Sequence, residues 1–166
     1  GSADAAAVIT GLNRMFSLGL EVSEMENLAA VLGSDVAFFI RNTPQFARGR
    51  GVELVPYDMP ELAGKIVVVL KPQIHVSTAE AYRGVVPVVP ATELQERLGR
   101  GLARWQEDVV NAFEATVFAE HPRLSALKAE LYRLGALYAS MSGSGSALYG
   151  IFPQDATPSL VFPPDT

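Results

Sequence analysis

The chain has 166 residues, of which 49% are hydrophobic, and its formal net charge is −5. This length suits one medium domain or two small ones, and the apolar fraction is ample for a buried core. A mostly acidic surface attracts neither nucleic acid nor an anionic membrane, so we expect neither as the main partner. The sequence contains no cysteine, which excludes disulfides, thiolate zinc sites and a cysteine nucleophile and fits a cytoplasmic protein.

The first part of the chain reads as helical. Small residues followed by apolar residues spaced three or four apart predict a helix over residues 4–18, ended by Gly19. Ser23 with Glu26 three residues later is a capping-box pattern, which predicts a second helix to about Leu32. A buried apolar run follows, and residues 46–54 indicate two short strands around a glycine turn.

The second part of the chain mixes strands and helices. Residues 58–64 read as a linker, and the β-branched run that follows predicts a strand over 65–71, ended by Pro72. Ser77 and Glu80 predict a short capped helix. Further helices are predicted near 92–100, 104–118 and 122–133, and closing strands at 136–141 and 147–152; we expect the three strands to share one sheet. The predicted domains are residues 1–62 and 63–153, with an irregular tail over 154–166.

A glycine-rich segment separates the two closing strands. It reads Ser142-Gly143-Ser144-Gly145-Ser146. Two glycines allow a tight bend that turns N–H and O–H donors toward one point, which predicts an anion site. The chain continues without the Lys-Ser or Lys-Thr pair of a Walker loop. An ordinary glycine-rich hairpin is the alternative interpretation.

The start of the chain offers a second anion site. Residues Gly1, Ser2 and Ala3 open the first predicted helix, where free N–H groups and the positive end of the helix dipole suit a phosphate. A cloning remnant is the alternative for the first two residues. The helix begins without a strand before it, so we expect the sequence to be the latter part of a longer protein.

Taken together and in order, several blocks of this sequence resemble the GHMP kinase superfamily, small-molecule kinases named for galactose, homoserine, mevalonate and phosphomevalonate. Within the superfamily they are most similar to kinases whose substrate is a cytidine diphospho-sugar alcohol. Their order and spacing agree along nearly the whole chain. The blocks are Gly1-Ser2-Ala3-Asp4-Ala5-Ala6-Ala7 with Leu12-Asn13, Leu32-Gly33-Ser34-Asp35-Val36-Ala37-Phe38-Phe39, Gly49-Arg50-Gly51, Val76-Ser77-Thr78-Ala79-Glu80-Ala81-Tyr82, and Met141-Ser142-Gly143-Ser144-Gly145-Ser146.

The resemblance implies an α+β protein with the GHMP kinase fold. The chain would hold the remainder of the ATP-loop domain and a C-terminal α+β domain with an antiparallel sheet flanked by helices. The implied activity is ATP-dependent phosphorylation of the substrate's 2-hydroxyl in isoprenoid biosynthesis. Family members also carry an N-terminal portion with a catalytic lysine, the cytidine pocket and the first part of the ATP loop. We expect that segment as a partner, and no phosphate transfer by this chain without it.

The resemblance also assigns roles to single residues. Asp35 would orient or deprotonate the accepting hydroxyl; the alternative is a carboxylate that caps a turn or the next helix. Gly1, Ser2 and Ala3 would bind the ATP phosphates, with the Ser2 hydroxyl also on Mg²⁺. Ser142, Gly143, Ser144 and Gly145 would support the same cofactor, and Thr78 would line the substrate's sugar-phosphate side unless it merely caps a helix.

Two other functions stay open at this point. One is a GHMP kinase for a different alcohol, such as mevalonate or homoserine. The other is a non-catalytic fragment that keeps only the phosphate-binding loops.

Overall fold

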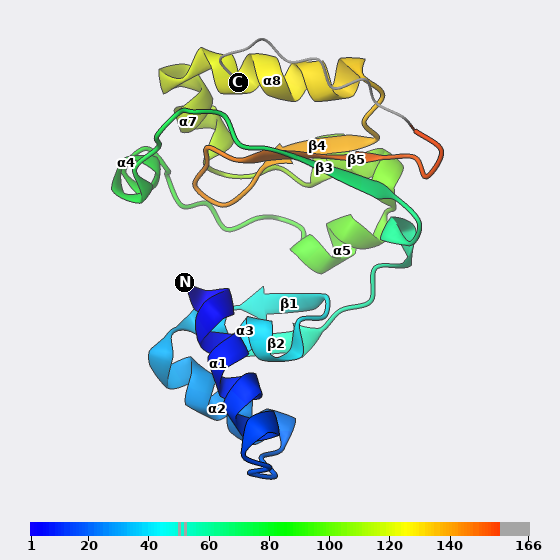
Figure 1. The fold of residues 1–166 in the computed structure, drawn as a ribbon. Coiled ribbons are helices and arrows are strands. Elements are labelled where there is room, and N and C mark those ends of the chain that lie inside the picture. The colour runs from blue at the N-terminus through cyan, green and yellow to red at the C-terminus, as the bar shows by residue number, and fades with distance from the viewer. Residues whose placement is uncertain (50, 52, 157–166) are drawn as a thin grey trace. The chain divides into compact units, whose positions relative to one another are not determined.

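The computed structural model describes residues 1–49, 51 and 53–156. The chain divides into two compact units, Gly1–Pro60 and a second unit that begins at Glu61. Figure 1 shows the elements of each unit. None of the helices in the described ranges is long and apolar enough to cross a membrane.

The first unit is built from three helices and a hairpin. The helices are α1 (Ser2–Met15), α2 (Val22–Leu32) and α3 (Ser34–Arg41), and the antiparallel strands are β1 (Gln45–Arg48) and β2 (Glu53–Pro56). The hairpin confirms the two short strands predicted around the glycine turn. Residues 50 and 52, within the turn segment, lie outside the described residues.

The predicted start of the second helix was wrong. Glu21, not Ser23, is the N-cap of α2, and its N–H donates to the Glu24 carboxylate at 2.8 Å. The reason is a contact between residues seven positions apart: the Asn13 amide both donates to and accepts from the backbone of Leu20, at 3.0 Å each. This anchor holds the chain so that helix geometry begins directly after Glu21. It also separates α1 from α2, and α1 ends at Met15 instead of continuing to residue 18.

Small side chains hold the three helices together. Ala6 of α1, Ala29 of α2 and Val36 and Ala37 of α3 form a buried cluster, with Ile9 and Leu54 packed against it. Because these side chains are small, the helix backbones pack closely. The cluster brings the first turns of α1 and α3 into the same core.

The second unit contains a three-stranded antiparallel sheet. Its strands β3 (Ile66–Leu70), β4 (Tyr138–Met141) and β5 (Leu148–Phe152) are ordered β3-β5-β4, with Val68 opposite Gly150 and Ser140 opposite Tyr149. The expectation that the three apolar segments share one sheet is confirmed.

Helices flank this sheet. They are η1 (Pro60–Leu62), which crosses the boundary between the units, α4 (Thr78–Arg83), α5 (Leu94–Gly99), η2 (Leu102–Arg104), α6 (Trp105–Asp108), α7 (Glu114–Glu120) and α8 (Pro122–Arg133). The single helix predicted over 104–118 was wrong, because the chain leaves helical geometry between Asp108 and Glu114. There the Tyr138 hydroxyl donates to the Val109 carbonyl at 2.7 Å, a tertiary contact, and the Phe113 N–H donates to the Asn111 side chain at 2.9 Å, a local one, so these partners replace helical hydrogen bonds.

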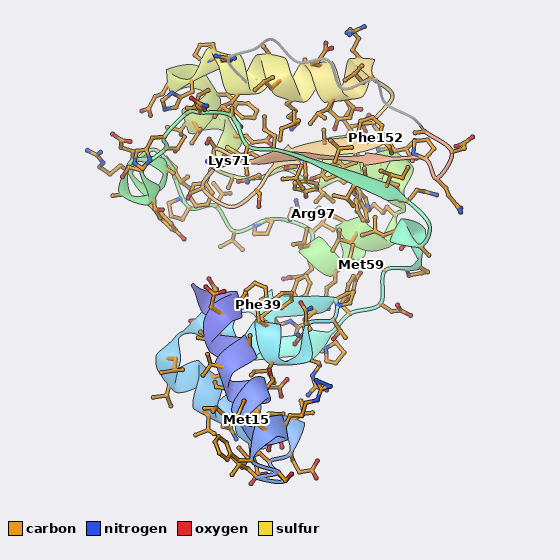
Figure 2. The ribbon with its side chains drawn as sticks, in the orientation of Figure 1. Met15, Phe39, Met59, Lys71, Arg97 and Phe152 are labelled. Atoms are coloured by element: carbon orange, nitrogen blue, oxygen red, sulfur yellow. The ribbon has the colours of Figure 1, made fainter. Side chains whose placement is uncertain are left out.

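The main core lies between the sheet and α8, which runs along one face of it (Figure 1). Leu124, Leu127 and Leu131 of α8 pack there with Leu148 and with Phe152, which Figure 2 labels. On the other face Trp105 is 3% exposed and makes an edge contact with the Tyr138 ring. Helices on antiparallel sheets confirm the α+β class. Residues 157–166 of the predicted tail lie outside the described residues.

Candidate functional site

The glycine–serine loop of residues 142–146 connects β4 to β5 in a tight turn. The Ser142 N–H donates to the Ala147 carbonyl at 2.8 Å, and the Gly145 N–H donates to the Ser142 carbonyl at 3.0 Å. Gly143 and Gly145 have φ values of +54° and +93°, which strongly favour glycine. A Cβ on Gly145 would also lie 2.8 Å from the Met141 sulfur. Two of the expected donors are therefore used to build the turn itself.

Asn111, which lies outside the loop in the sequence, fixes the loop by side-chain hydrogen bonds. Its Nδ2 donates to the carbonyl oxygens of Met141 and Gly143, at 2.7 and 2.8 Å. Its Oδ1 is held in turn by the Phe113 N–H. One amide side chain therefore sets the positions of two peptide groups on either side of Ser142.

Glu114 holds the end of β4 next to the loop. The residue is 5% exposed, and its Oε1 accepts hydrogen bonds from the Met141 N–H at 2.8 Å and the Ser140 hydroxyl at 3.1 Å. Its Oε2 lies 2.6 Å from the Lys128 ammonium. A buried carboxylate is tolerated here because a cation and two further donors compensate its lost hydration.

Thr78 and Lys71 also contact the glycine–serine loop. The Thr78 and Ser144 hydroxyls lie 3.4 Å apart, and the Lys71 ammonium donates to the Ser146 hydroxyl at 2.7 Å. Thr78 is exposed and is the first residue of α4. The N-cap is Ser77, which shares a capping box with Glu80, so the alternative of a capping threonine does not hold.

In the first unit, Gly1 is the N-cap of α1, and Ser2 and Ala3 lie in its first turn. The helix's hydrogen-bond ladder begins with the Ala5 N–H donating to the Gly1 carbonyl at 3.1 Å. The N–H groups of Ser2 and Ala3 therefore have no intrahelical partner, and they lie at the positive end of the dipole. Asp4 is also in this turn, and its carboxylate lies 2.5 Å from the Gly1 nitrogen.

Asp35 lies in the first turn of α3, directly after Gly33 and Ser34. Its side chain is exposed, while the next two residues, Val36 and Ala37, are buried in the core of the unit. The core thus fixes the backbone and leaves the carboxylate accessible to a small molecule. A first-turn carboxylate also favours the helix dipole.

Metal-ligating side chains are sparse in the described part of the chain. It contains no group of three or more histidine and acidic side chains that could hold a metal ion. At the expected Mg²⁺ position the Ser2 side chain offers a single half-buried hydroxyl. A magnesium ion bound there would need oxygen ligands from the nucleotide, as is usual for this ion.

Sequence reasoning missed Lys71, Asn111 and Glu114. The helical pattern held a signal for Glu114, which lies three residues before the buried Val117 and so on the apolar face. Lys128 likewise lies four residues after the buried Leu124 and next to Leu127, and so borders the apolar face of α8. A charged residue on the apolar face of each of two helices is a signal for a buried ion pair. Nothing in the local sequence marks Asn111 or Lys71.

A large segment of the second unit matches a known family. Residues 90–162 match the family described as GHMP kinases C terminal. The chain carries a GHMP kinase C-terminal domain. The matched GHMP segment includes Asn111, Glu114, Lys128 and the glycine–serine loop, so the contacts that hold the loop lie largely inside this domain.

Relatives match nearly the whole chain. Two are named 4-diphosphocytidyl-2-C-methyl-D-erythritol kinase: that of Bacteroides thetaiotaomicron is 45% identical over 157 residues, and that of Parabacteroides distasonis is 44% identical over 152. The alignments cover 95% and 92% of this chain but only 57% and 56% of the relatives, in their C-terminal part. The chain thus spans little more than half the length of these curated relatives.

A solved structure supports the same family. A crystal structure of 4-(cytidine 5'-diphospho)-2C-methyl-D-erythritol kinase matches with a TM-score of 0.74 and 31% sequence identity. The match covers 90% of this chain and 55% of that kinase. The expected GHMP kinase fold is therefore confirmed.

Proposed function

We propose that this chain is the C-terminal part of an ATP-dependent kinase that phosphorylates the 2-hydroxyl of 4-diphosphocytidyl-2-C-methyl-D-erythritol. This reaction belongs to non-mevalonate isoprenoid biosynthesis, and we place it in the cytoplasm. The observation that carries the proposal is identity of 45% and 44% along more than nine tenths of the chain to two kinases of that name. Such similarity extends through both units rather than through the GHMP domain alone.

Asp35 is the proposed catalytic residue. Phosphoryl transfer to an alcohol needs mainly positioning and charge neutralisation, together with one group that orients or deprotonates the hydroxyl. An exposed carboxylate on a helix whose next residues are buried suits this task, because its backbone is fixed while the carboxylate can reach a substrate. The carboxylate would accept the hydroxyl proton while the alcohol oxygen bonds to the transferred phosphoryl group and the bond from that group to ADP breaks, so that ADP leaves.

The first turn of α1 is the proposed ATP contact of the first unit. The N–H groups of Ser2 and Ala3 have no intrahelical partner and would bind phosphate oxygens, with Gly1 leaving room for close approach. The Ser2 hydroxyl would bind the nucleotide's Mg²⁺. When bound, ATP supplies the transferred phosphoryl group and Mg²⁺ neutralises its charge.

The glycine–serine loop and Thr78 are the proposed contacts of the second unit. Ser142 and Gly145 form the turn by their own hydrogen bonds, which leaves the N–H groups of Gly143 and Ser144 for a ligand. Thr78 lies beside Ser144 and would bind the sugar-phosphate side of the substrate.

A hybrid kinase tests the proposal. It joins the part of the Bacteroides thetaiotaomicron kinase that precedes the matched segment to this 166-residue chain. We expect ADP release that depends on both ATP and the cytidyl substrate. The unmodified Bacteroides kinase is the positive control, and we expect no release from the 166-residue chain by itself.

Two outcomes would contradict the proposal. One is a folded hybrid, judged by circular dichroism and a cooperative melt, that releases no ADP with the cytidyl substrate. The other is release that depends instead on mevalonate or homoserine, which would assign the chain to a different GHMP kinase.

A further inference from the structure

Lys71 is a cation at the glycine–serine loop that neither the motifs nor the comparisons assign. It directly follows β3, and Figure 2 labels it. Its Nζ lies 2.7 Å from the Ser146 Oγ, a contact between residues 75 positions apart. The fold, not the local sequence, therefore places this charge beside the loop.

The contact with Ser146 constrains the ammonium without neutralising it. Ser146 is 1% exposed, and its hydroxyl donates to the carbonyl of Ile74. The serine hydrogen is therefore used, and the oxygen accepts from Lys71. An ammonium has three N–H donors, and within the part of the chain that the structure describes two of them have no protein acceptor on this exposed side chain.

Within the described ranges, no acidic group compensates this cation. Lys128 is paired with Glu114, but among the residues that the structure describes no carboxylate lies within 4.0 Å of the Lys71 nitrogen. The chain as a whole carries a net charge of −5. An unpaired ammonium held at a defined place on an acidic protein is a local anion site.

The neighbouring hydroxyls define the kind of anion. Thr78 and Ser144 lie 3.4 Å from each other, and Ser144 is two residues from the serine that holds Lys71. One of these hydroxyls donates to the other, so the remaining hydroxyl hydrogen and the free N–H groups of the ammonium are the donors that this segment presents. That set suits a ligand with many adjacent acceptor oxygens, such as a diphosphate.

We propose that Lys71, together with Ser144 and Thr78, binds a nucleotide diphosphate group. The proposal rests on the proposed function, in which both ATP and the cytidyl substrate carry such a group. Lys71 would contact phosphate oxygens with its two remaining N–H donors while Ser146 keeps its side chain extended toward the loop.

Binding of inorganic diphosphate to the 166-residue chain tests this site directly. Lys71→Met removes the charge and keeps the length of the side chain, and we expect it to weaken binding about tenfold. Lys71→Arg should recover most of the affinity. Lys65→Met is the matched control, because it removes the same charge just before β3, at the other end of that strand, and we expect less than a twofold change.

Salt dependence distinguishes direct contact between Lys71 and the anion from a purely structural role of Lys71 in the loop. If Lys71 contacts the anion, the fall of affinity with rising salt will be less steep in Lys71→Met than in the parent chain. Equal affinity and equal salt dependence in Lys71→Met and Lys65→Met, with both variants folded, would overturn the proposal. So would a parent chain that is folded and binds no diphosphate.

The hybrid kinase distinguishes the two sources of diphosphate. A raised KM for ATP with an unchanged KM for the cytidyl substrate in Lys71→Met assigns the site to ATP, and the reverse assigns it to the substrate. Unchanged values of both KM would overturn the proposal. A hybrid without activity would instead contradict the proposed function and leave the diphosphate measurement as the test of Lys71.

Discussion

The buried Glu114 carboxylate and the half-buried Lys128 ammonium form an ion pair, 2.6 Å apart, at the point where β4 enters the glycine–serine loop. The other carboxylate oxygen of Glu114 accepts the Met141 N–H. Two helices, α7 and α8, are thereby connected to the last residue before the loop. The pair couples the stability of the second unit to the shape of its proposed ligand site.

Glu114→Gln should lower the free energy of unfolding of the second unit by about 3 kcal/mol, because it leaves the Lys128 charge without its partner in a mostly buried site. Urea unfolding followed by the fluorescence of Trp105 measures this, since Trp105 is the single tryptophan and is buried in that unit. The double variant Glu114→Gln/Lys128→Met should lose less unfolding free energy than the sum of the losses in the two single variants. Strict additivity would show that the pair contributes no coupling energy.

Asn111→Ala should weaken both the fold and ligand binding at the loop. Three hydrogen bonds disappear, two to the Met141 and Gly143 carbonyls and one from the Phe113 N–H, so we expect a loss of about 1–2 kcal/mol in unfolding free energy and a clear loss of diphosphate affinity. Asn111→Asp should be more damaging than Ala, because a carboxylate would face two carbonyl oxygens. Asn27→Ala, on the exposed surface of α2, is the control. Diphosphate affinity equal to that of the control would show that the loop keeps its shape without Asn111.

Asp35→Asn in the hybrid kinase should lower kcat at least ~10²-fold and change the KM for ATP little, because the amide keeps the size of the side chain but cannot accept a proton. Glu24→Gln is the matched control, since Glu24 is also an exposed acid in the first turn of a helix of the same unit. We expect its kcat to stay within a few-fold of the parent. A similarly mild effect in Asp35→Asn would reduce Asp35 to a residue that favours the helix dipole.

The second unit should lose stability in alkaline solution. Burial raises the pKa of Tyr138 above its ordinary value of 10.0, and it also raises those of Tyr149 and Tyr132. Below pH 10 these phenols are neutral in both the folded and the unfolded chain. Above pH 10 they ionise first in the unfolded chain, so the free energy of unfolding falls by at most about 1.4 kcal/mol per pH unit for each tyrosine.

Urea unfolding at pH 8 and at pH 11 measures this alkaline loss. Tyr138→Phe should be less stable than the parent chain at pH 8, because it lacks the hydrogen bond to the Val109 carbonyl. Between pH 8 and pH 11, however, its free energy of unfolding should fall by less than that of the parent. An equal alkaline loss in the variant and the parent would show that Tyr138 does not contribute.

Several features of the fold could be predicted from the sequence because their causes are local. The β-branched run at residues 66–69 favours a strand wherever it lies, and Ser77 with Glu80 forms the predicted capping box within one turn. The positive φ values in the glycine–serine loop likewise follow from its glycines. The order of the motif blocks predicted the GHMP family, which the comparisons confirm. The roles of Asp35, Ser2 and Thr78 stay predictions.

The tertiary structure decided where the helices begin and end and which side chains hold the loop. The start of α2 depends on Asn13, seven residues away from Leu20, and the break before α7 depends on Tyr138, 29 residues away from Val109. Asn111 and Lys71 acquire their places through contacts across 30 and 75 residues. Local propensity does not encode such hydrogen bonds, because each donor finds its acceptor only after segments that are distant in the sequence have packed together.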